Sequence, residues 1–290
     1  MPTQGLFVGL VTIDLVYLTE NFPQSNDKLV ANDYTISAGG PATNAAIAFR
    51  HFGNLPTILG VMGCHPMTQI ICQELQQYNI ALADLNPTRA EPPPVSSIIV
   101  TAGSGDRAVV SINATKSPVS NDFLPLDRCQ NFDIVLIDGH QILPSVAIAQ
   151  LAQSHQIPVV LDGGSWKPGL EEVLPFVNYA VCSANFYPPE CDNRQEVFAY
   201  LEAISIPHIA ITDGANPIQY LSNGDRATVA VPQINPRDTL GAGDIFHGAF
   251  CHFILQQDFP TALASAAQIA SHACQQFGTR EWMKSLPATL

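Results

Sequence analysis

The feature that most constrains the fold is the regular alternation of two kinds of segment between Phe132 and Gly214. Four short apolar runs are separated by segments whose apolar residues have helical spacing, notably 145–155 and 196–204. Strands without polar alternation are buried on both faces, which is typical of a parallel sheet covered by helices. The four runs are DIVLIDG (133–139), PVVLDGG (158–164), YAVCSAN (179–185) and HIAITDG (208–214).

Each of these runs ends in polar or glycine residues, and this predicts where a ligand binds. The closing pairs are Asp138-Gly139, Asp162-Gly163, Ala184-Asn185 and Asp213-Gly214. Doubly wound folds bind ligands at the carboxyl ends of their parallel strands. We therefore expect an α/β protein with a doubly wound, mainly parallel sheet flanked by helices, and a site at that edge.

A second β-rich region interrupts this order. The segments 95–102 and 107–114 flank Gly103-Ser104-Gly105-Asp106, which is a hairpin signal. With residues 15–38 they form either a small separate sheet or an extension of the main sheet. Taking the first reading, we predict an α/β core of residues 1–14, 39–94 and 115–290, and a small sheet of 15–38 and 95–114. A first strand over Leu6–Val11 is expected to run on toward Asp14.

The stretch Asp238-Thr239-Leu240-Gly241-Ala242-Gly243-Asp244 combines a flexible turn, a helix start and an acid. Glycines let backbone N–H groups converge on an anion, and a helix N-terminus adds positive partial charge. An acid in the first helical turn can orient a hydroxyl toward that anion, which suits phosphoryl transfer. Taken alone, the stretch is equally consistent with an ordinary helix start at which the dipole favours Asp244.

A second glycine-rich helix start lies far upstream, at Gly39-Gly40-Pro41-Ala42-Thr43-Asn44. A helical pattern follows it and ends at Gly53, a plausible C-terminal cap. The pair of stretches, in this order and separation, resembles the paired signatures of the ribokinase-like (PfkB) carbohydrate kinases. The resemblance covers the chain from Gly5 to about Phe277 and is more specific than either stretch alone.

This resemblance implies a ribokinase-like fold in which the small β-sheet forms a lid over a sugar. The implied activity is ATP-dependent transfer of the γ-phosphoryl group to a hydroxyl of a small sugar, with Mg²⁺. Two alternatives stay open: a nucleoside kinase, which would carry an aromatic stacking pair, and a catalytically silent nucleotide- or sugar-binding regulator. No P-loop motif and no Gly-x-Gly-x-x-Gly after the first strand is present.

The resemblance also assigns candidate site residues. Asp244 is the expected catalytic base, and the amides around Gly241, Ala242 and Gly243 are the expected anion hole. The expected sugar ligands are Asp14, Gly39, Gly40 and Asn44. The structural alternatives are a turn aspartate at position 14 and a helix start with an exposed asparagine at position 44.

Asp138-Gly139-His140 resembles the Glu-Gly-Arg stretch of ketohexokinases, which lies near the sugar. Asp138 and His140 are therefore candidate sugar ligands, although His140 is equally consistent with a local hydrogen-bonding role. Arg107 lies on an expected lid strand and either reaches the site or is solvated. A phosphorylated sugar would need basic side chains to bind its phosphate group, and only isolated residues such as Arg107 and Arg280 are available for this.

For the nucleotide, Thr212 and Gly214 match the family's Thr-x-Gly strand end, and Asn185 matches the first residue of its Asn-x-x-Glu motif. The fourth residue of that motif is Pro188 here, with Glu190 two positions further on, which puts the acid associated with magnesium in doubt. Residues 271–278 are expected to close over the adenine. Asp238 is implied as a ligand of a monovalent cation such as K⁺.

Composition limits the partners. The formal net charge is −13 with only 12 Lys and Arg, so the chain has no basic field for nucleic acid or an anionic membrane. The seven cysteines are scattered without a Cys-x-x-Cys pair, which argues against a structural zinc site or a disulfide framework. We expect a cytoplasmic protein, as either a monomer or a homodimer joined through the lid, since both occur in the family.

Overall fold

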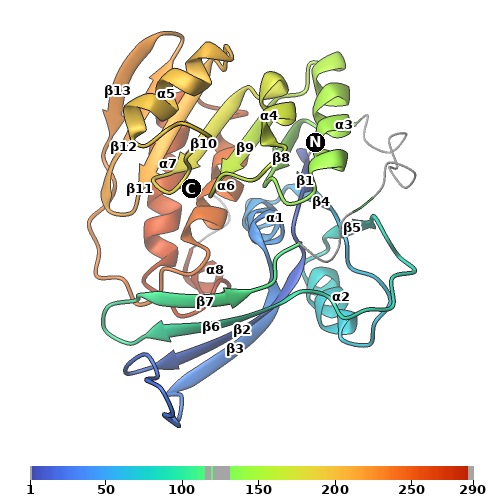
Figure 1. Ribbon diagram of the computed structural model, residues 1–290, viewed down its shortest axis with the longest axis vertical. Coiled ribbons are helices and arrows are strands. Elements are labelled where there is room, and N and C mark those ends of the chain that lie inside the picture. Colours follow the sequence, from blue (N-terminus) through green and yellow to red (C-terminus); the bar gives the residue numbers. More distant parts are fainter. Residues whose placement is uncertain (1, 115–118, 120–130, 287–290) are drawn as a thin grey trace.

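The computed structural model describes residues 2–114, 119 and 131–286, and it contains two separate sheets (Figure 1). The larger sheet has nine strands in the order β13-β12-β11-β10-β9-β8-β1-β4-β5. The seven strands from β11 to β5 are parallel to one another, and β12 and β13 add an antiparallel edge. The predicted doubly wound, mainly parallel sheet is confirmed. Its strands are β1 (Gln4–Val8), β4 (Leu55–Gly60), β5 (Ala81–Asp84), β8 (Ile134–Ile137), β9 (Val159–Gly163), β10 (Tyr179–Ser183), β11 (His208–Asp213), β12 (Asn216–Ser222) and β13 (Asp225–Val229).

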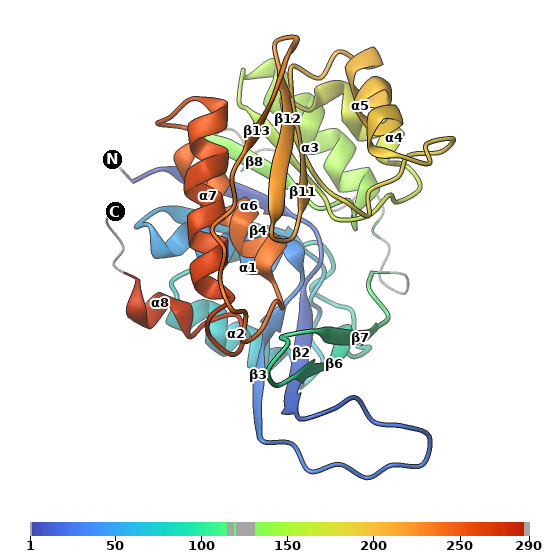
Figure 2. The same cartoon turned by 90° about the vertical axis from the view of Figure 1, so that its left-hand side faces the viewer.

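Helices cover both faces of the large sheet (Figure 2). One core lies between the sheet and α1, α6 and α7, and the other lies between the opposite face and α3, α4 and α5. Alternate residues of one strand enter different cores: Phe7 of β1 packs in the first, and Leu6 and Val8 pack in the second. The helices are α1 (Pro41–His51), α2 (Thr68–Gln77), α3 (Ile142–Ser154), α4 (Leu170–Val173), a 3₁₀ turn (Leu174–Phe176), α5 (Arg194–Ala203), α6 (Ala242–Phe253), α7 (Phe259–Ala273) and α8 (Trp282–Ser285).

Helix α6 lies in the middle of the first core, beside α1 and α7. Gly248 permits this close approach, because a Cβ atom at this position would lie 2.2 Å from the carbonyl oxygen of Ala45 in α1. The start of α6 is thereby held next to the start of α1. None of the helices within the described ranges is both long and apolar enough to span a bilayer.

The small sheet has four strands in the order β3-β2-β6-β7 and lies below the large one in Figure 1. Strands β6 and β7 form the predicted hairpin, and β2 pairs with β6 in parallel and with β3 antiparallel. The small sheet is separate and does not extend the main sheet. Its strands are β2 (Thr12–Thr19), β3 (Asp33–Gly39), β6 (Val95–Thr101) and β7 (Arg107–Ser111).

The expected first strand, from Leu6 to Val11 and on toward Asp14, is in fact two strands. Strand β1 ends at Val8 in the large sheet, and β2 begins at Thr12 in the small one. The chain changes sheets at Gly9, where a Cβ atom would lie 2.0 Å from the Asp138 carboxyl carbon. The apolar run hid this crossing because both strands are buried. As a result, Asp14 is part of the small sheet.

Candidate active site

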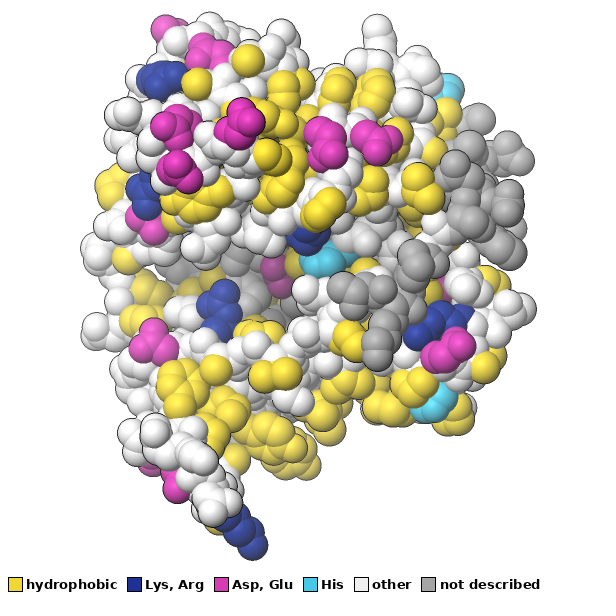
Figure 3. Space-filling view, viewed as in Figure 1, with side chains coloured by type: hydrophobic (Ala, Val, Ile, Leu, Met, Phe, Trp, Pro, Cys, Tyr) yellow, Lys and Arg dark blue, Asp and Glu magenta, His cyan; other side chains and the backbone are white. Residues whose placement is uncertain are grey.

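The two glycine-rich helix starts meet in space. The side-chain amide of Asn44, in the first turn of α1, donates a 2.8 Å hydrogen bond to Oδ2 of Asp244, in the first turn of α6. These residues are 200 positions apart in the sequence. The surface is hollowed between the large and small sheets (Figure 3). The expected sugar ligand Asn44 and the expected base Asp244 are thus in direct contact.

The start of α6 has the backbone of an anion site. Gly241 has φ of 68°, and a Cβ atom there would lie 2.7 Å from the side chain of Thr279, so this turn requires glycine. Gly243 is exposed, and a Cβ atom added to it would meet no atom within 4 Å. The N–H of Ala242 bonds to the Thr239 carbonyl oxygen at 3.3 Å, so the N–H groups of the first turn that lack an intrahelical partner begin at the open surface of Gly243.

The carboxyl group of Asp244 lies among charged neighbours. Burial, followed by the charge of Asp162, raises its pKa to about 6, while the hydrogen bond from Asn44 and the charge of His247 act to lower it. The charge of Asp14 adds a further raising effect. A carboxylate with a pKa just below neutral pH is suited to accept a proton in the physiological range.

The charges of Asp162 and His247 both act on Asp244. Asp162 was expected only as one of the polar strand ends at the ligand-binding edge, and His247 was not among the expected site residues. Asp162 is the next-to-last residue of β9, and one of its carboxylate oxygens lies 3.5 Å from Nδ1 of His247. The imidazole is buried one turn along α6, where Nδ1 is 2.7 Å from the Gly243 carbonyl oxygen and Nε2 is 3.0 Å from that of Val181. His247 therefore ties the start of α6 to β10. His247 follows Asp244 by three positions in a predicted helix, and this spacing was the sequence signal that could have placed it near Asp244.

The side chain of Asp14 on β2 lies against the backbone of Gly39 on β3, two residues beyond its register partner Ser37. The Asp14 carboxylate accepts a 2.7 Å hydrogen bond from the Thr12 hydroxyl, and burial raises its pKa. A Cβ atom at position 39 would lie 2.0 Å from the nearer carboxylate oxygen of Asp14. Glycine at this position is therefore what makes room for the acid. Ser96 of β6 is paired with Asp14, and its hydroxyl also bonds to that of Ser111.

Gly40 turns the chain from β3 into α1. Its φ is 98°, and a Cβ atom would lie 2.3 Å from the carbonyl oxygen of Leu10. No side chain caps the start of α1, and Pro41 at its first position needs no partner for a backbone N–H. Gly40 thus packs the turn between β3 and α1 directly onto the segment that joins the two sheets.

Asp138 is buried, and its carboxylate is occupied by backbone amides. It accepts hydrogen bonds from Leu10 at 2.9 Å, from Ala42 at 3.2 Å and from His140 at 2.9 Å. Burial acts to raise its pKa, but the charges of His140 and Lys167 and the amide bonds lower it to about 2. The His140 ring nitrogen Nδ1 lies 3.1 Å from the same carboxylate. These contacts join β8, the sheet crossing and α1, so we assign Asp138 a structural role beneath the floor of the site.

The expected nucleotide residues gather at the ends of β10 and β11. Asn185 is exposed just after β10, and the Thr212 hydroxyl donates to the Cys182 carbonyl oxygen at 3.3 Å. Gly214 has φ of 54°, and no atom lies within 4 Å of an added Cβ atom. The backbone N–H of Ala184 bonds to the Thr212 carbonyl, which places the two strand ends side by side.

Asp238 links the α6 turn to the C-terminal segment that was expected to close over the adenine. Its carboxylate oxygens accept 2.8 Å hydrogen bonds from the amides of Leu240 and Gly278, and burial raises its pKa. Among the described residues, no group of three or more His, Cys, Asp or Glu side chains is arranged to hold a metal ion. A cation at Asp238 would need ligands from the backbone, and it stays a prediction.

The hairpin of the small sheet also contacts the α6 turn. The Arg107 guanidinium donates to both the carbonyl and the hydroxyl oxygen of Thr239 at 2.9 Å. In turn, the Thr239 hydroxyl donates to the carbonyl oxygen of Gly105 at 2.9 Å. Arg107 therefore reaches the turn at the start of α6 from the small sheet.

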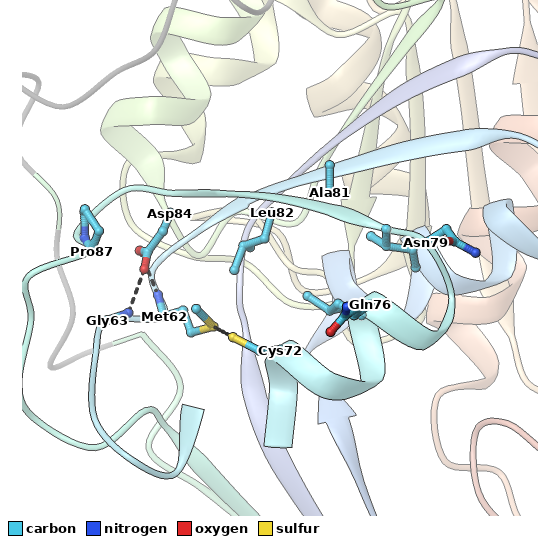
Figure 4. Close-up of a pocket in the computed structure, with 11 residues that line it drawn as sticks. Met62, Gly63, Cys72, Gln76, Asn79, Ala81, Leu82, Asp84 and Pro87 are labelled. Carbon is cyan, nitrogen blue, oxygen red and sulfur yellow. Dashed lines mark hydrogen bonds between the residues drawn. The ribbon is translucent and has the colours of Figure 1, made fainter. Parts of the chain in front are cut away.

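A pocket of about 660 Å³ lies elsewhere, between α2 and β5 (Figure 4). Its most polar wall is Asp84, whose carboxylate accepts hydrogen bonds from the amides of Met62 and Gly63. None of the residues around this pocket belongs to the candidate site. They are Met62, Gly63, Cys72, Leu75, Gln76, Asn79, Ile80, Ala81, Leu82, Asp84 and Pro87.

The chain is similar to known sugar kinases over nearly its whole length. It is 22% identical to the ribokinase of Bacillus subtilis, covering 95% of this chain and 94% of that protein, and 23% identical to the deoxyribokinase of Salmonella typhi, covering 96% and 95%. The structure of Arabidopsis thaliana ribokinase complexed with ribose and ATP matches with a TM-score of 0.77 at 19% identity, covering 99% and 96%. A microbiome-derived acarbose kinase matches with a TM-score of 0.80 at 18% identity, covering 99% of both chains.

The family model for pfkB family carbohydrate kinases matches residues 3–286. This match agrees with the ribokinase fold of the structural neighbours and with the two glycine-rich helix starts. The ketohexokinase-like character expected for residues 138–140 is not part of that evidence. The chain therefore belongs to the pfkB family of carbohydrate kinases and is a sugar kinase.

Proposed function

We propose that this protein transfers the γ-phosphoryl group of ATP to a hydroxyl group of a small, neutral sugar. The observation that carries the proposal is the hydrogen bond between Asn44 and Asp244. It joins the turn expected to bind the sugar to the turn expected to bind the transferred phosphoryl group. A sugar hydroxyl next to Asp244 would thus lie in line with the start of α6.

In this mechanism Asp244 orients the attacking hydroxyl and takes up its proton as the phosphoryl group transfers. The transition state is largely dissociative, so the proton need not leave beforehand. The amides of the turn at Gly241, Ala242 and Gly243 stabilise the charge on the phosphoryl oxygens. Asn185, Thr212 and Gly214 provide the nucleotide side, as their positions at neighbouring strand ends support.

The floor of the sugar site consists of Asp14, Gly39, Gly40 and Asn44. Carboxylate and amide groups of this kind recognise hydroxyl groups. Arg280 is not available to bind a sugar phosphate, because its guanidinium already bonds to Glu74, Ala38, Asn44 and Thr279. This favours a neutral sugar. Ribose and 2-deoxyribose are the first substrates to test, since the similar proteins include a ribokinase and a deoxyribokinase.

We further propose that Mg²⁺ accompanies the nucleotide. Magnesium ions in kinases are commonly held by one or two carboxylates together with substrate phosphates, so a site without three protein ligands fits this ion. The residues that would hold it are Asp162, near the end of β9, and Asn185, just after the neighbouring strand β10. When bound, the ion neutralises phosphate charge. K⁺ at Asp238 and a cytoplasmic location, where ATP is available, are part of the same proposal.

The test is sugar-dependent ADP release by the purified protein with MgATP. We expect turnover with at least one pentose or hexose, and Asp244→Asn should lower kcat by about 10²- to 10⁴-fold with little loss of stability. Phosphorylated sugars and nucleosides serve as controls. Near-normal turnover by Asp244→Asn, or turnover with nucleosides alone, would contradict the proposal.

We also propose that the outer face of the small sheet forms a homodimer. This face, opposite Asp14, carries exposed apolar side chains on three strands, and Figure 3 shows hydrophobic groups over this sheet. They are Tyr17, Tyr34, Ile36 and Val110, with exposed fractions of 44%, 65%, 48% and 75%. Sedimentation velocity should show a dimer that Tyr34→Glu dissociates. A monomeric wild-type protein at tens of micromolar would exclude this arrangement.

A further inference from the structure

Arg280 lies behind the candidate active site and makes contacts with three other parts of the fold. Its Nε donates to Glu74 of α2 at 2.7 Å, and its Nη2 donates to the Ala38 carbonyl oxygen of β3 at 2.6 Å. Its Nη1 donates to the side-chain oxygen of Asn44 at 2.9 Å and to the Thr279 hydroxyl at 2.7 Å. The Arg280 and Glu74 side chains are only 13% and 15% exposed, which fixes this fork in place.

The contact with Arg280 determines how Asn44 is oriented. A primary amide has one accepting oxygen and one donating NH₂ group, whereas a guanidinium group can only donate. The atom of Asn44 that faces Arg280 must therefore be its oxygen. Its NH₂ group is then directed at Asp244, to which it donates at 2.8 Å. If Asn44 were flipped, an amide oxygen would face a carboxylate and an NH₂ group would face a cation.

We propose that Arg280 is a positioning residue for catalysis, which fixes the Asn44 amide so that it donates to the Asp244 carboxylate. Two consecutive hydrogen bonds, from Arg280 to Asn44 and from Asn44 to Asp244, connect the C-terminal segment to the acid at the start of α6. The catalytic consequence rests on the proposed function, in which Asp244 is the base. The geometric consequence does not, because it concerns only the state of the Asp244 carboxyl group.

The pKa of the Asp244 carboxyl group provides a measure of whether Asn44 is held in this orientation. The Asn44 hydrogen bond stabilises the charged carboxylate and acts to lower the pKa of Asp244. The other groups that face this carboxyl are Asp162 on β9, His247 on α6 and Asp14 on β2. None of these three side chains is hydrogen-bonded to Arg280 within the described chain, but the charge of Arg280 also acts to lower the pKa of Asp14. Arg280→Lys, which keeps that charge, therefore separates loss of the fork from loss of the charge. Releasing Asn44 should therefore raise the pKa of Asp244 while these neighbours stay in place.

The experiment follows the titration of Asp244 by NMR in protein labelled with ¹³C-carboxyl aspartate, with Asp244→Asn used to assign its signal. The variants are Asn44→Ala, Arg280→Met and the double variant. Arg226→Met is the matched control, because Arg226 lies on the edge strand β13 and makes an exposed ion pair with Glu202. Arg280→Lys is a second variant, since lysine keeps the charge but cannot form the fork. Thermal unfolding of each variant accompanies the titrations.

We expect Asp244 to titrate at higher pH in both Asn44→Ala and Arg280→Met, with no additional change in the double variant. Arg280→Lys should move in the same direction, and Arg226→Met should match the wild type. In the kinase assay, Arg280→Met should lower kcat about tenfold or more, with a smaller change in the KM for ATP.

A wild-type titration midpoint in folded Arg280→Met, or additive effects in the double variant, would overturn the inference. If Arg280→Met does not fold, Arg280→Lys decides in the same way. These results can be told apart from failure of the proposed function. A wild-type protein that phosphorylates no sugar, but whose Asp244 responds to both substitutions, would keep the positioning role and reject the kinase mechanism.

Discussion

Replacing Gly39 by alanine should specifically disable sugar binding. The backbone of Gly39 is not in the left-handed region, so alanine adds no conformational strain there. Its Cβ atom, however, would lie 2.0 Å from Oδ2, 2.1 Å from Cγ and 2.4 Å from Oδ1 of Asp14. Real Cβ atoms essentially never approach closer than 3.0 Å, so the carboxylate must move by about 1 Å.

That displacement sets the size of the effect. A hydrogen bond to a charged group contributes about 1.5–3 kcal/mol, and each 1.4 kcal/mol is tenfold in affinity. If Asp14 binds the sugar through one or more such bonds, Gly39→Ala should raise the KM for sugar by about 10- to 100-fold. The KM for ATP should change much less, because the proposed nucleotide residues lie at the ends of β10 and β11.

The assay is steady-state kinetics with both substrates varied, on wild type, Gly39→Ala, Asp14→Asn and the double variant. The double variant should be no worse than the poorer single variant, since both changes remove one interaction. Gly53→Ala is the control: its φ of 81° gives a cost in stability, but no atom lies within 4 Å of the added Cβ. A sugar KM within twofold of wild type in Gly39→Ala would refute this reasoning.

Two further predictions concern charged groups. Because burial raises the pKa of Asp244 to about 6, kcat/KM should fall below that pH and reach about a tenth of its maximum near pH 5. The nucleotide phosphate titrates in the same range. The pH profile is therefore compared with that of Arg280→Met, in which only the pKa of Asp244 is expected to move. If the fall of kcat/KM at acid pH were unaltered in this variant, Asp244 would not be the group that causes it. Lowering the pKa of Asp138 from 3.8 to about 2 corresponds to about 2.5 kcal/mol of stability, which is present above pH 4 and lost as the pH falls through 2. Asp138→Asn should therefore lower the free energy of unfolding, measured with urea at pH 7, by about 3 kcal/mol. The control is Asp133→Asn, at an exposed acid that bonds to the Gln4 amide, and it should cost under about 1 kcal/mol. Equal losses in the two variants would show that burial of the Asp138 carboxylate does not cause the loss of stability.

The sequence was sufficient to predict the elements that carry strong periodic signals. The four apolar runs after Phe132 are β8 to β11, and Gly103–Asp106 does join a hairpin. The two glycine-rich stretches also begin helices, and the positive φ values of Gly40 and Gly241 at the two N-termini favour glycine there. In each case the local chemistry and the tertiary structure require the same residue.

Other features could not be read from the sequence. The crossing at Gly9 lies inside one apolar run, and burial in two different sheets leaves the same pattern. Asp138 ends a strand like the other acids, yet its oxygens face amides of Leu10 and Ala42. Arg280 looked like an isolated cation, and only its neighbours in space show that its donors are taken. Partners far apart in the sequence leave no local signal.

The hydrogen bonds of Arg107 and Gly105 with Thr239 join the β6–β7 hairpin to the turn before α6, so the two are expected to move together. Any outward swing of the hairpin removes the Arg107 donor and the Gly105 acceptor from the turn that is proposed to bind the phosphoryl group. An open cleft, through which water enters, would thus also be a cleft with a loosened anion hole. Futile hydrolysis of ATP would be suppressed by the same contacts that admit and enclose the acceptor.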